Sequence, residues 1–91
     1  MSTKEKVKKQ IEEMDDQIGI WEAKIEKAKA EAKVQYKEKL ASLKAKRNEV
    51  KAKYDELADS TEEKWEEAKD VFSSASESFK EGFNKLKSLF N

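Results

Sequence analysis

Pairs of carboxylates spaced four residues apart form the pattern in this sequence that comes closest to a metal site. Residues at this spacing lie on one face of a helix, and helical bundles use such oxygens to hold two metal ions. That chemistry also requires a Glu-x-x-His motif on facing helices, and this chain contains no histidine. We therefore expect no metal and interpret these acids as a solvated face. The pairs are Glu12/Asp16, Glu62/Glu66, Glu63/Glu67 and Glu66/Asp70.

The composition also lacks the side chains on which most other catalytic sites depend. Without histidine or cysteine, the chain has no base that titrates near neutral pH and no thiol nucleophile. Glycine occurs only at Gly19 and Gly82, so there is no glycine-rich loop to hold a phosphate group. We therefore predict that the protein is not an enzyme and uses no cofactor.

The charges balance overall but are unevenly distributed along the chain. Twenty Lys and Arg residues match twenty Asp and Glu residues, so no net charge attracts nucleic acid or anionic lipid. Residues 24–53 hold eleven basic residues and four glutamates, whereas residues 59–70 hold six acidic residues and two lysines. The basic stretch has only one aromatic, Tyr36, among its charges, and its lysines are scattered around the helix. These features argue against a nucleic-acid partner and favour a solvated face.

The apolar residues form a far stronger pattern, and it predicts long helices. From Val7 to Leu57 they recur mostly at steps of three and four, which places them on one side of an α-helix. No proline interrupts this stripe, and Ser2 with Glu5 forms a capping box before it. We predict an all-α fold in one domain, residues 1–91, whose first helix spans about 3–57.

A turn at residues 58–60 and a second, amphipathic helix over about 61–90 complete the prediction. The apolar stripe lapses near residue 58, and Ser60 with Glu63 forms another capping box. The linker has no glycine of the kind that usually ends a helix, so an unbroken helix of about 85 residues is the rival prediction.

Folding the second helix back onto the first gives a helical hairpin with a definite register. Tyr54 then meets Trp65, Leu40 meets Phe79, and Tyr36 meets Phe83. The acidic segment 59–70 lies beside the basic residues before the turn. The residues expected to pack this hairpin are Tyr36, Leu40, Tyr54, Trp65, Phe72, Phe79, Phe83 and Leu86.

The hairpin leaves the beginning of the long helix without a partner in its own chain. The second helix reaches back only to about Ala28, and burial of each large side chain before that point is worth about 1.5–3 kcal/mol. We therefore expect these residues to pack against other copies in a homo-oligomeric coiled coil. Both tryptophans are in register with their stripes, which favours packing over a binding hot spot. The expected self-association residues are Val7, Ile11, Met14, Ile18, Trp21 and Ile25.

Two alternative functions stay open at this point. The second helix carries four phenylalanines, with lysines beside them, as helices that lie on a membrane surface do. It could therefore bind lipid reversibly. Staggered overhangs that fail to close could instead build a filament. The sequence shows neither a signal peptide nor a membrane-spanning segment, and a soluble, cytoplasmic protein is the default expectation.

The motif Trp21-Glu22-Ala23-Lys24-Ile25, the spacing from Trp21 to Trp65, and Ser60 before the second tryptophan also carry a resemblance. On these residues the sequence resembles a widespread bacterial family of short coiled-coil-domain proteins associated with stress response, whose biochemical role is unknown. The resemblance covers nearly the whole chain, although the linker glycine common in the family is missing here. It implies no catalytic residues. The expected function is a self-associating structural or stress-associated scaffold.

Overall fold

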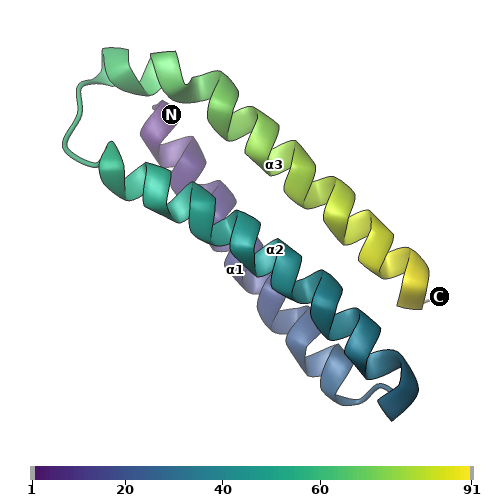
Figure 1. Ribbon diagram of the computed structural model, residues 1–91. Coiled ribbons are helices and arrows are strands. Elements are labelled where there is room, and N and C mark those ends of the chain that lie inside the picture. The colour runs from purple at the N-terminus through teal and green to yellow at the C-terminus, as the bar shows by residue number, and fades with distance from the viewer. Residues whose placement is uncertain (1, 91) are drawn as a thin grey trace.

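The computed structural model describes residues 2–90, which form three helices and no strand. The helices are α1 (Thr3–Glu26), α2 (Ala30–Glu56) and α3 (Glu62–Phe90). They pack into an elongated bundle of 48 × 19 × 18 Å in which α1 and α3 run in the same direction and α2 runs against them (Figure 1). The predicted all-α fold is confirmed.

The prediction of one helix over residues 3–57 is wrong, because the helix is interrupted at residues 27–29 and α1 folds back along α2. The physical reason is the fate of the apolar side chains of α1. A continuous rod would leave them in water, whereas burying each is worth about 1.5–3 kcal/mol. Interrupting a helix forfeits only a few hydrogen bonds, each worth about 1 kcal/mol net. Packing therefore overrides local helix propensity at this point.

The core runs along the middle of all three helices and contains every residue of the predicted overhang. Each of the six predicted self-association residues is at most 8% exposed. The prediction that these residues lack a partner in their own chain is therefore wrong. The chain forms a three-helix bundle in which α1 supplies one wall of the core. The buried apolar residues are Val7, Ile11, Met14, Ile18, Trp21, Ile25, Leu40, Leu43, Val50, Trp65, Phe72, Phe79, Phe83 and Leu86.

The second linker matches the prediction more closely. Residues 57–61 separate α2 from α3, so the turn expected at 58–60 is present and the unbroken 85-residue alternative is wrong. The capping residue differs from the prediction, because the hydroxyl of Thr61, not of Ser60, accepts the Lys64 N–H at 3.4 Å. At the start of α1, the Glu5 N–H donates to the Ser2 hydroxyl at 3.2 Å, as the first capping box predicts.

The register between α2 and α3 holds near the turn and shifts further away. Tyr54 and Trp65 have ring centroids 5.3 Å apart, the pairing that the hairpin predicts. Toward the other end, the Tyr36 hydroxyl donates to the Leu89 carbonyl at 2.9 Å, six residues beyond the predicted partner Phe83. The Phe83 ring lies instead 6.3 Å from Trp21 of α1. The shift arises because α3 packs against both other helices, not against α2 alone.

Candidate functional site

The linker between α1 and α2 contains neither the glycine that usually ends a helix nor a side chain that caps the start of the next one. Lys27 keeps a near-helical backbone (φ −89°, ψ −5°), and Lys29 turns out of the helix with φ −64° and ψ 145°. The φ of Lys29 is already that of a helix, so only its ψ differs. No side chain caps the start of α2. Nothing local therefore favours a break over a continuous helix.

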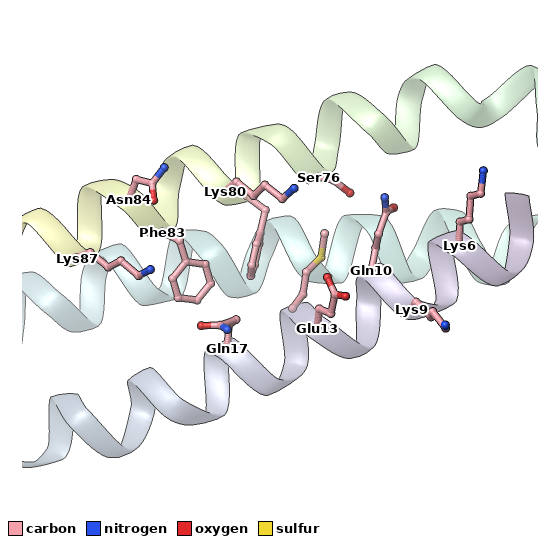
Figure 2. A pocket seen from close by; sticks show the side chains of 12 residues that line it. Lys6, Lys9, Gln10, Glu13, Gln17, Ser76, Lys80, Phe83, Asn84 and Lys87 are labelled. Atoms are coloured by element: carbon pink, nitrogen blue, oxygen red, sulfur yellow. The ribbon is translucent and has the colours of Figure 1, made fainter. Parts of the chain in front are cut away.

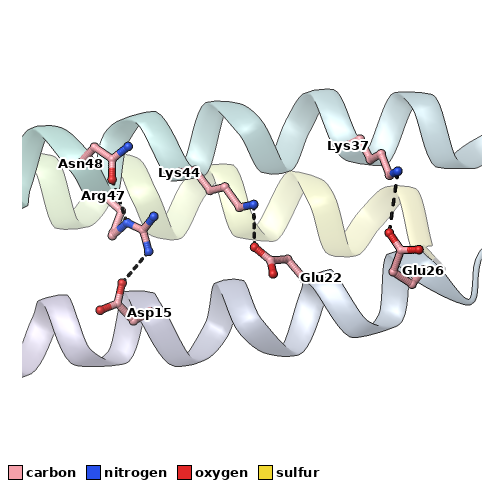
Figure 3. A network of polar contacts seen from close by, with 7 residues as sticks. All are labelled: Asp15, Glu22, Glu26, Lys37, Lys44, Arg47 and Asn48. Carbon is pink, nitrogen blue, oxygen red and sulfur yellow. Dashed lines mark hydrogen bonds and ion pairs between the residues drawn. The ribbon is translucent and has the colours of Figure 1, made fainter.

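Ion pairs join α1 to α2 along their contact, as Figure 3 shows. Lys44 lies 2.6 Å from Glu22, and Arg47 lies 2.7 Å from Asp15. Glu26 accepts contacts from two further lysines, Lys33 at 3.8 Å and Lys37 at 3.7 Å. The basic stretch is thus neutralised by α1, and within residues 2–90 no ion pair links it to segment 59–70 as the hairpin predicted. The physical reason is that α1, absent from the predicted pairing, occupies this face of α2.

A hollow of about 590 Å³ lies on the same α1–α2 contact. Its charged lining residues are Glu22, Glu26, Lys37 and Lys44, all of which take part in the ion pairs. Opposite charges that already neutralise one another leave little to attract a charged ligand. We therefore do not interpret this hollow as a binding site.

A different groove, of about 620 Å³, runs between α1 and α3 (Figure 2). Its apolar floor consists of Met14, Phe79 and Phe83, each at most 6% exposed. Its rim is mainly cationic, because four lysines and one glutamate give a net charge of +3. No ion pair involves these five residues in the described part of the chain. The polar and charged lining residues are Lys6, Lys9, Gln10, Glu13, Gln17, Ser76, Lys80, Asn84 and Lys87.

Ser76 is the most unusual residue of this groove. It is 8% exposed, and its hydroxyl oxygen is buried with no hydrogen-bond partner. Figure 2 shows this hydroxyl pointing from α3 into the space between α3 and α1. The Trp65 indole N–H, also on α3, is likewise buried without a partner. An unsatisfied buried polar group costs about 1–3 kcal/mol, so α3 carries two such penalties.

Hydrogen bonds hold α3 to the rest of the bundle near both of its ends. The Thr3 hydroxyl donates to the Glu66 carboxylate at 2.5 Å, and Tyr36 reaches Leu89 at the other end. Glu66 belongs to two of the carboxylate pairs considered from the sequence. Within residues 2–90, no three acidic residues gather into a group that could hold a metal ion.

The predicted site residues are brought together, though differently from the prediction. The eight hairpin-packing residues all lie in the core or against it, and Tyr36 and Tyr54 are the two that stay partly exposed. Sequence reasoning missed the linker at 27–29 and the α1–α3 groove. One signal was available for the linker, since the apolar steps change to four, four and four between Ala28 and Leu40.

None of the helices within residues 2–90 is both long and apolar enough to span a membrane. No protein-family model, curated protein or solved structure matches the chain.

Proposed function

We propose that this protein is a non-catalytic scaffold that self-associates by exchanging α1 between copies. In the exchanged form, residues 27–29 become helical and α1 continues into α2. The α1 of each copy then packs against α2 and α3 of another. A cytoplasmic, stress-associated role, which rests on the family resemblance, belongs to the same proposal.

The observation that carries the proposal is the composition of the linker. Lys27, Ala28 and Lys29 are good helix formers, and neither glycine, proline nor a capping side chain interrupts them. Packing of α1 onto its own chain therefore imposes the break. Once α1 packs on a second copy, the linker is free to adopt the helix that its residues prefer.

Exchange rebuilds the contacts of the monomer between two chains. The six core residues of α1 enter an equivalent core, and the pairs of Glu22 with Lys44 and Asp15 with Arg47 form between copies. The linker gains helical hydrogen bonds, each worth about 1 kcal/mol. Association costs about 4–15 kcal/mol at a 1 M standard state. Because two chains must meet before α1 can be exchanged, the fraction of the exchanged form should rise with protein concentration.

Exchange of α1 lengthens the molecule, and the way in which copies exchange it decides the kind of assembly. A continuous helix of about 55 residues spans about 80 Å, against 48 Å for the closed bundle. Reciprocal exchange closes into a dimer, whereas exchange from one copy to the next propagates as a filament. The dimer is the simpler product, because both chains bury α1 with no end left open.

Light scattering after size exclusion tests this proposal. The unaltered chain, at concentrations from micromolar to millimolar, should show a dimer fraction that rises with concentration. The double variant Ala28→Gly/Lys29→Asp supplies a helix-ending glycine and a capping aspartate, and should lower that fraction by about tenfold or more. Ala58→Gly, in the other linker, is the matched control and should leave it unchanged.

Two results would overturn the proposal. One is a 10.5 kDa monomer at every concentration. The other is a dimer that the double variant forms as readily as the unaltered chain, since association would then not depend on the linker. Electron microscopy of the concentrated protein separates dimers from filaments.

The attachment of α3 supports a second candidate function, reversible binding to a membrane surface. The face of α3 that carries Trp65, Phe72, Phe79, Phe83 and Leu86 packs into the core, while no ion pair within residues 2–90 ties this helix to the others. Release of α3 would present that face to lipid, with lysines beside it.

A reversible lock on α3 tests the membrane proposal. A β carbon built on Gly82 lies 3.7 Å from Leu43 Cγ, so the two positions face each other across the α2–α3 contact, and we place a pair of cysteines there. We expect the reduced Leu43→Cys/Gly82→Cys variant to float with phosphatidylglycerol vesicles and the oxidised form to stay in solution. Equal flotation of the two forms, or flotation of neither, would contradict release of α3.

A further inference from the structure

We infer that the α1–α3 groove of the closed bundle binds a single-chain anionic amphiphile, a long aliphatic chain ending in a carboxylate. The groove lies away from the linker. Its floor includes Phe79 and Phe83 of the apolar face that α3 would offer to a membrane, but the groove itself exists only while α3 is packed in the closed bundle. The inference therefore depends neither on exchange of α1 nor on release of α3.

The size and shape of the groove suit one extended chain. Its volume of about 620 Å³ falls within the range of about 300–1,000 Å³ that is usual for small-molecule sites. Its lining runs from Lys6 to Gln17 on α1 and from Ser76 to Lys87 on α3. Each stretch is about 16 Å long at the rise of an α-helix, so the groove is elongated along the bundle.

The floor of the groove selects for an apolar tail. Met14, Phe79 and Phe83 line it, and the Phe79 and Phe83 ring centroids lie 4.9 Å apart. A thioether and two aromatic rings form an adaptable apolar surface on which a hydrocarbon chain can pack. Small polar metabolites would gain little from such a floor.

The rim selects for a negative head group. Lys6, Lys9, Lys80 and Lys87 stand around the groove, and only Glu13 opposes them. None of these lysines forms an ion pair in the described structure, in contrast with Lys44 of the α1–α2 contact. Unpaired charges of one sign around an apolar slot raise the local concentration of ligands of opposite sign.

Ser76 gives the groove a polar group that the fold itself leaves unused. Its buried hydroxyl, which lacks a partner, can donate to a carboxylate oxygen, and a hydrogen bond to a charged group is stronger than one between neutral groups. The ligand would then supply the partner that the protein does not. Ser76 thus places the head group near the wall formed by α3, beside Lys80.

Titration calorimetry with dodecanoate, below its micelle concentration, tests the inference on the full chain. We expect one dodecanoate per chain, bound about tenfold or more tightly than dodecanol, because the alcohol has the same tail without the charge. Acetate, which has the charge without the tail, should not bind. Equal binding of dodecanoate and dodecanol, or no dodecanoate binding, would overturn the inference.

Charge reversal on α3 locates the site. Lys80→Glu/Lys87→Glu should weaken dodecanoate binding by about tenfold or more, since it reverses two charges on the rim. Lys64→Glu/Lys69→Glu makes the same change on exposed positions of the same helix, outside the groove, and should have little effect. Circular dichroism verifies that both variants fold. If the two double variants bind dodecanoate equally well, the groove is not the site.

Ser76→Ala tests the head-group contact by itself. Loss of the hydroxyl should weaken dodecanoate binding by about tenfold and leave dodecanol binding unchanged. If it weakens both or neither, Ser76 does not bind the carboxylate.

Parallel flotation with phosphatidylglycerol vesicles separates this inference from the membrane proposal. Dodecanoate binding by a protein that ignores vesicles supports the groove and removes release of α3. Vesicle binding by a protein that does not bind dodecanoate does the reverse. Light scattering of the same samples reports on exchange of α1 independently of both.

Discussion

The α1–α2 contact and the α1–α3 contact share one helix but are built on different principles. Paired charges line the first, among them Arg47 with Asp15 and Lys44 with Glu22. The second has unpaired lysines, an open groove and a buried hydroxyl without a partner. Paired charges specify which surfaces meet, so α1 should recognise α2 whether the two belong to one chain or to two. Apolar packing, with one hydrogen bond near each end, holds α3, and this packing is what a ligand or a membrane would replace in our proposals.

The largest effect should come from removing the apolar anchor of α3. Trp65 is 1% exposed and stacks on Phe72, with ring centroids 5.6 Å apart, and the Tyr54 ring lies 5.3 Å from it. Trp65→Ala should lower the free energy of unfolding by about 3–5 kcal/mol, through lost burial and the cavity left behind. Urea denaturation followed by circular dichroism measures it.

Val71→Ala is the control for this variant. Val71 lies on the same helix but is 55% exposed, so its removal should change the unfolding free energy by less than about 0.5 kcal/mol. A similar effect of the two substitutions would show that apolar packing does not hold α3, and the contrast between the two contacts would fail.

The two linkers show which parts of the fold can be predicted from sequence. Residues 57–61 contain aspartate, serine and threonine, which favour turns and helix starts, and the sequence predicts this turn. Residues 27–29 contain only helix formers. There the break depends on the packing of α1 against α2 and α3, which local helix propensity does not determine.

The groove was beyond sequence reasoning for a related reason. It forms between α1 and α3, and the predicted hairpin placed most of α1 out of reach of the second helix. Ser76 itself gave a usable signal, because it lies four residues after Phe72 and three before Phe79. That spacing puts its hydroxyl on the core side of the helix, where a serine requires an explanation.

Ser76→Ala should have the next largest effect on stability, and in the opposite direction. Removing a buried hydroxyl that has no partner should raise the free energy of unfolding by about 1–3 kcal/mol. Ser74→Ala, at an exposed position of the same helix, gains only helix propensity, about 0.5 kcal/mol. Urea denaturation of both variants compares them. Equal gains would mean that the Ser76 hydroxyl finds a partner in solution, which would weaken the case that a ligand supplies one.

The two glycines allow the tightly packed side of α3 to be compared with an open surface of α1. Gly19 has no atom within 4 Å of an added β carbon, so Gly19→Ala should raise the unfolding free energy by about 1 kcal/mol. At Gly82, the added carbon would lie 2.6 Å from Leu43 Cδ2, and Leu43 is 2% exposed. Overpacking costs about 1–3 kcal/mol, which should cancel or exceed the same gain in propensity.

Thermal melts of the two variants provide the measurement. Gly19→Ala should raise the melting temperature, whereas Gly82→Ala should leave it unchanged or lower it. Equal increases would show that Leu43 moves aside at no cost, and hence that α3 packs against α2 as loosely as it does beside the groove.

The smallest effect concerns the ion pairs that distinguish the α1–α2 contact. The Arg47–Asp15 pair is partly exposed, at 22% and 40%, so Asp15→Asn should lower the unfolding free energy by about 0.2–1 kcal/mol. Glu56→Gln removes the ion pair between Lys53 and Glu56 within α2. These side chains are 43% and 70% exposed, so this substitution should lower the unfolding free energy by less than Asp15→Asn does. The difference between the two variants should shrink in 1 M salt, because screening weakens both pairs. The Asp15 variant should also dimerise less, since exchange of α1 would rebuild this pair between chains. A dimer fraction unchanged by Asp15→Asn would mean that apolar packing alone directs α1, and the paired charges would then specify nothing.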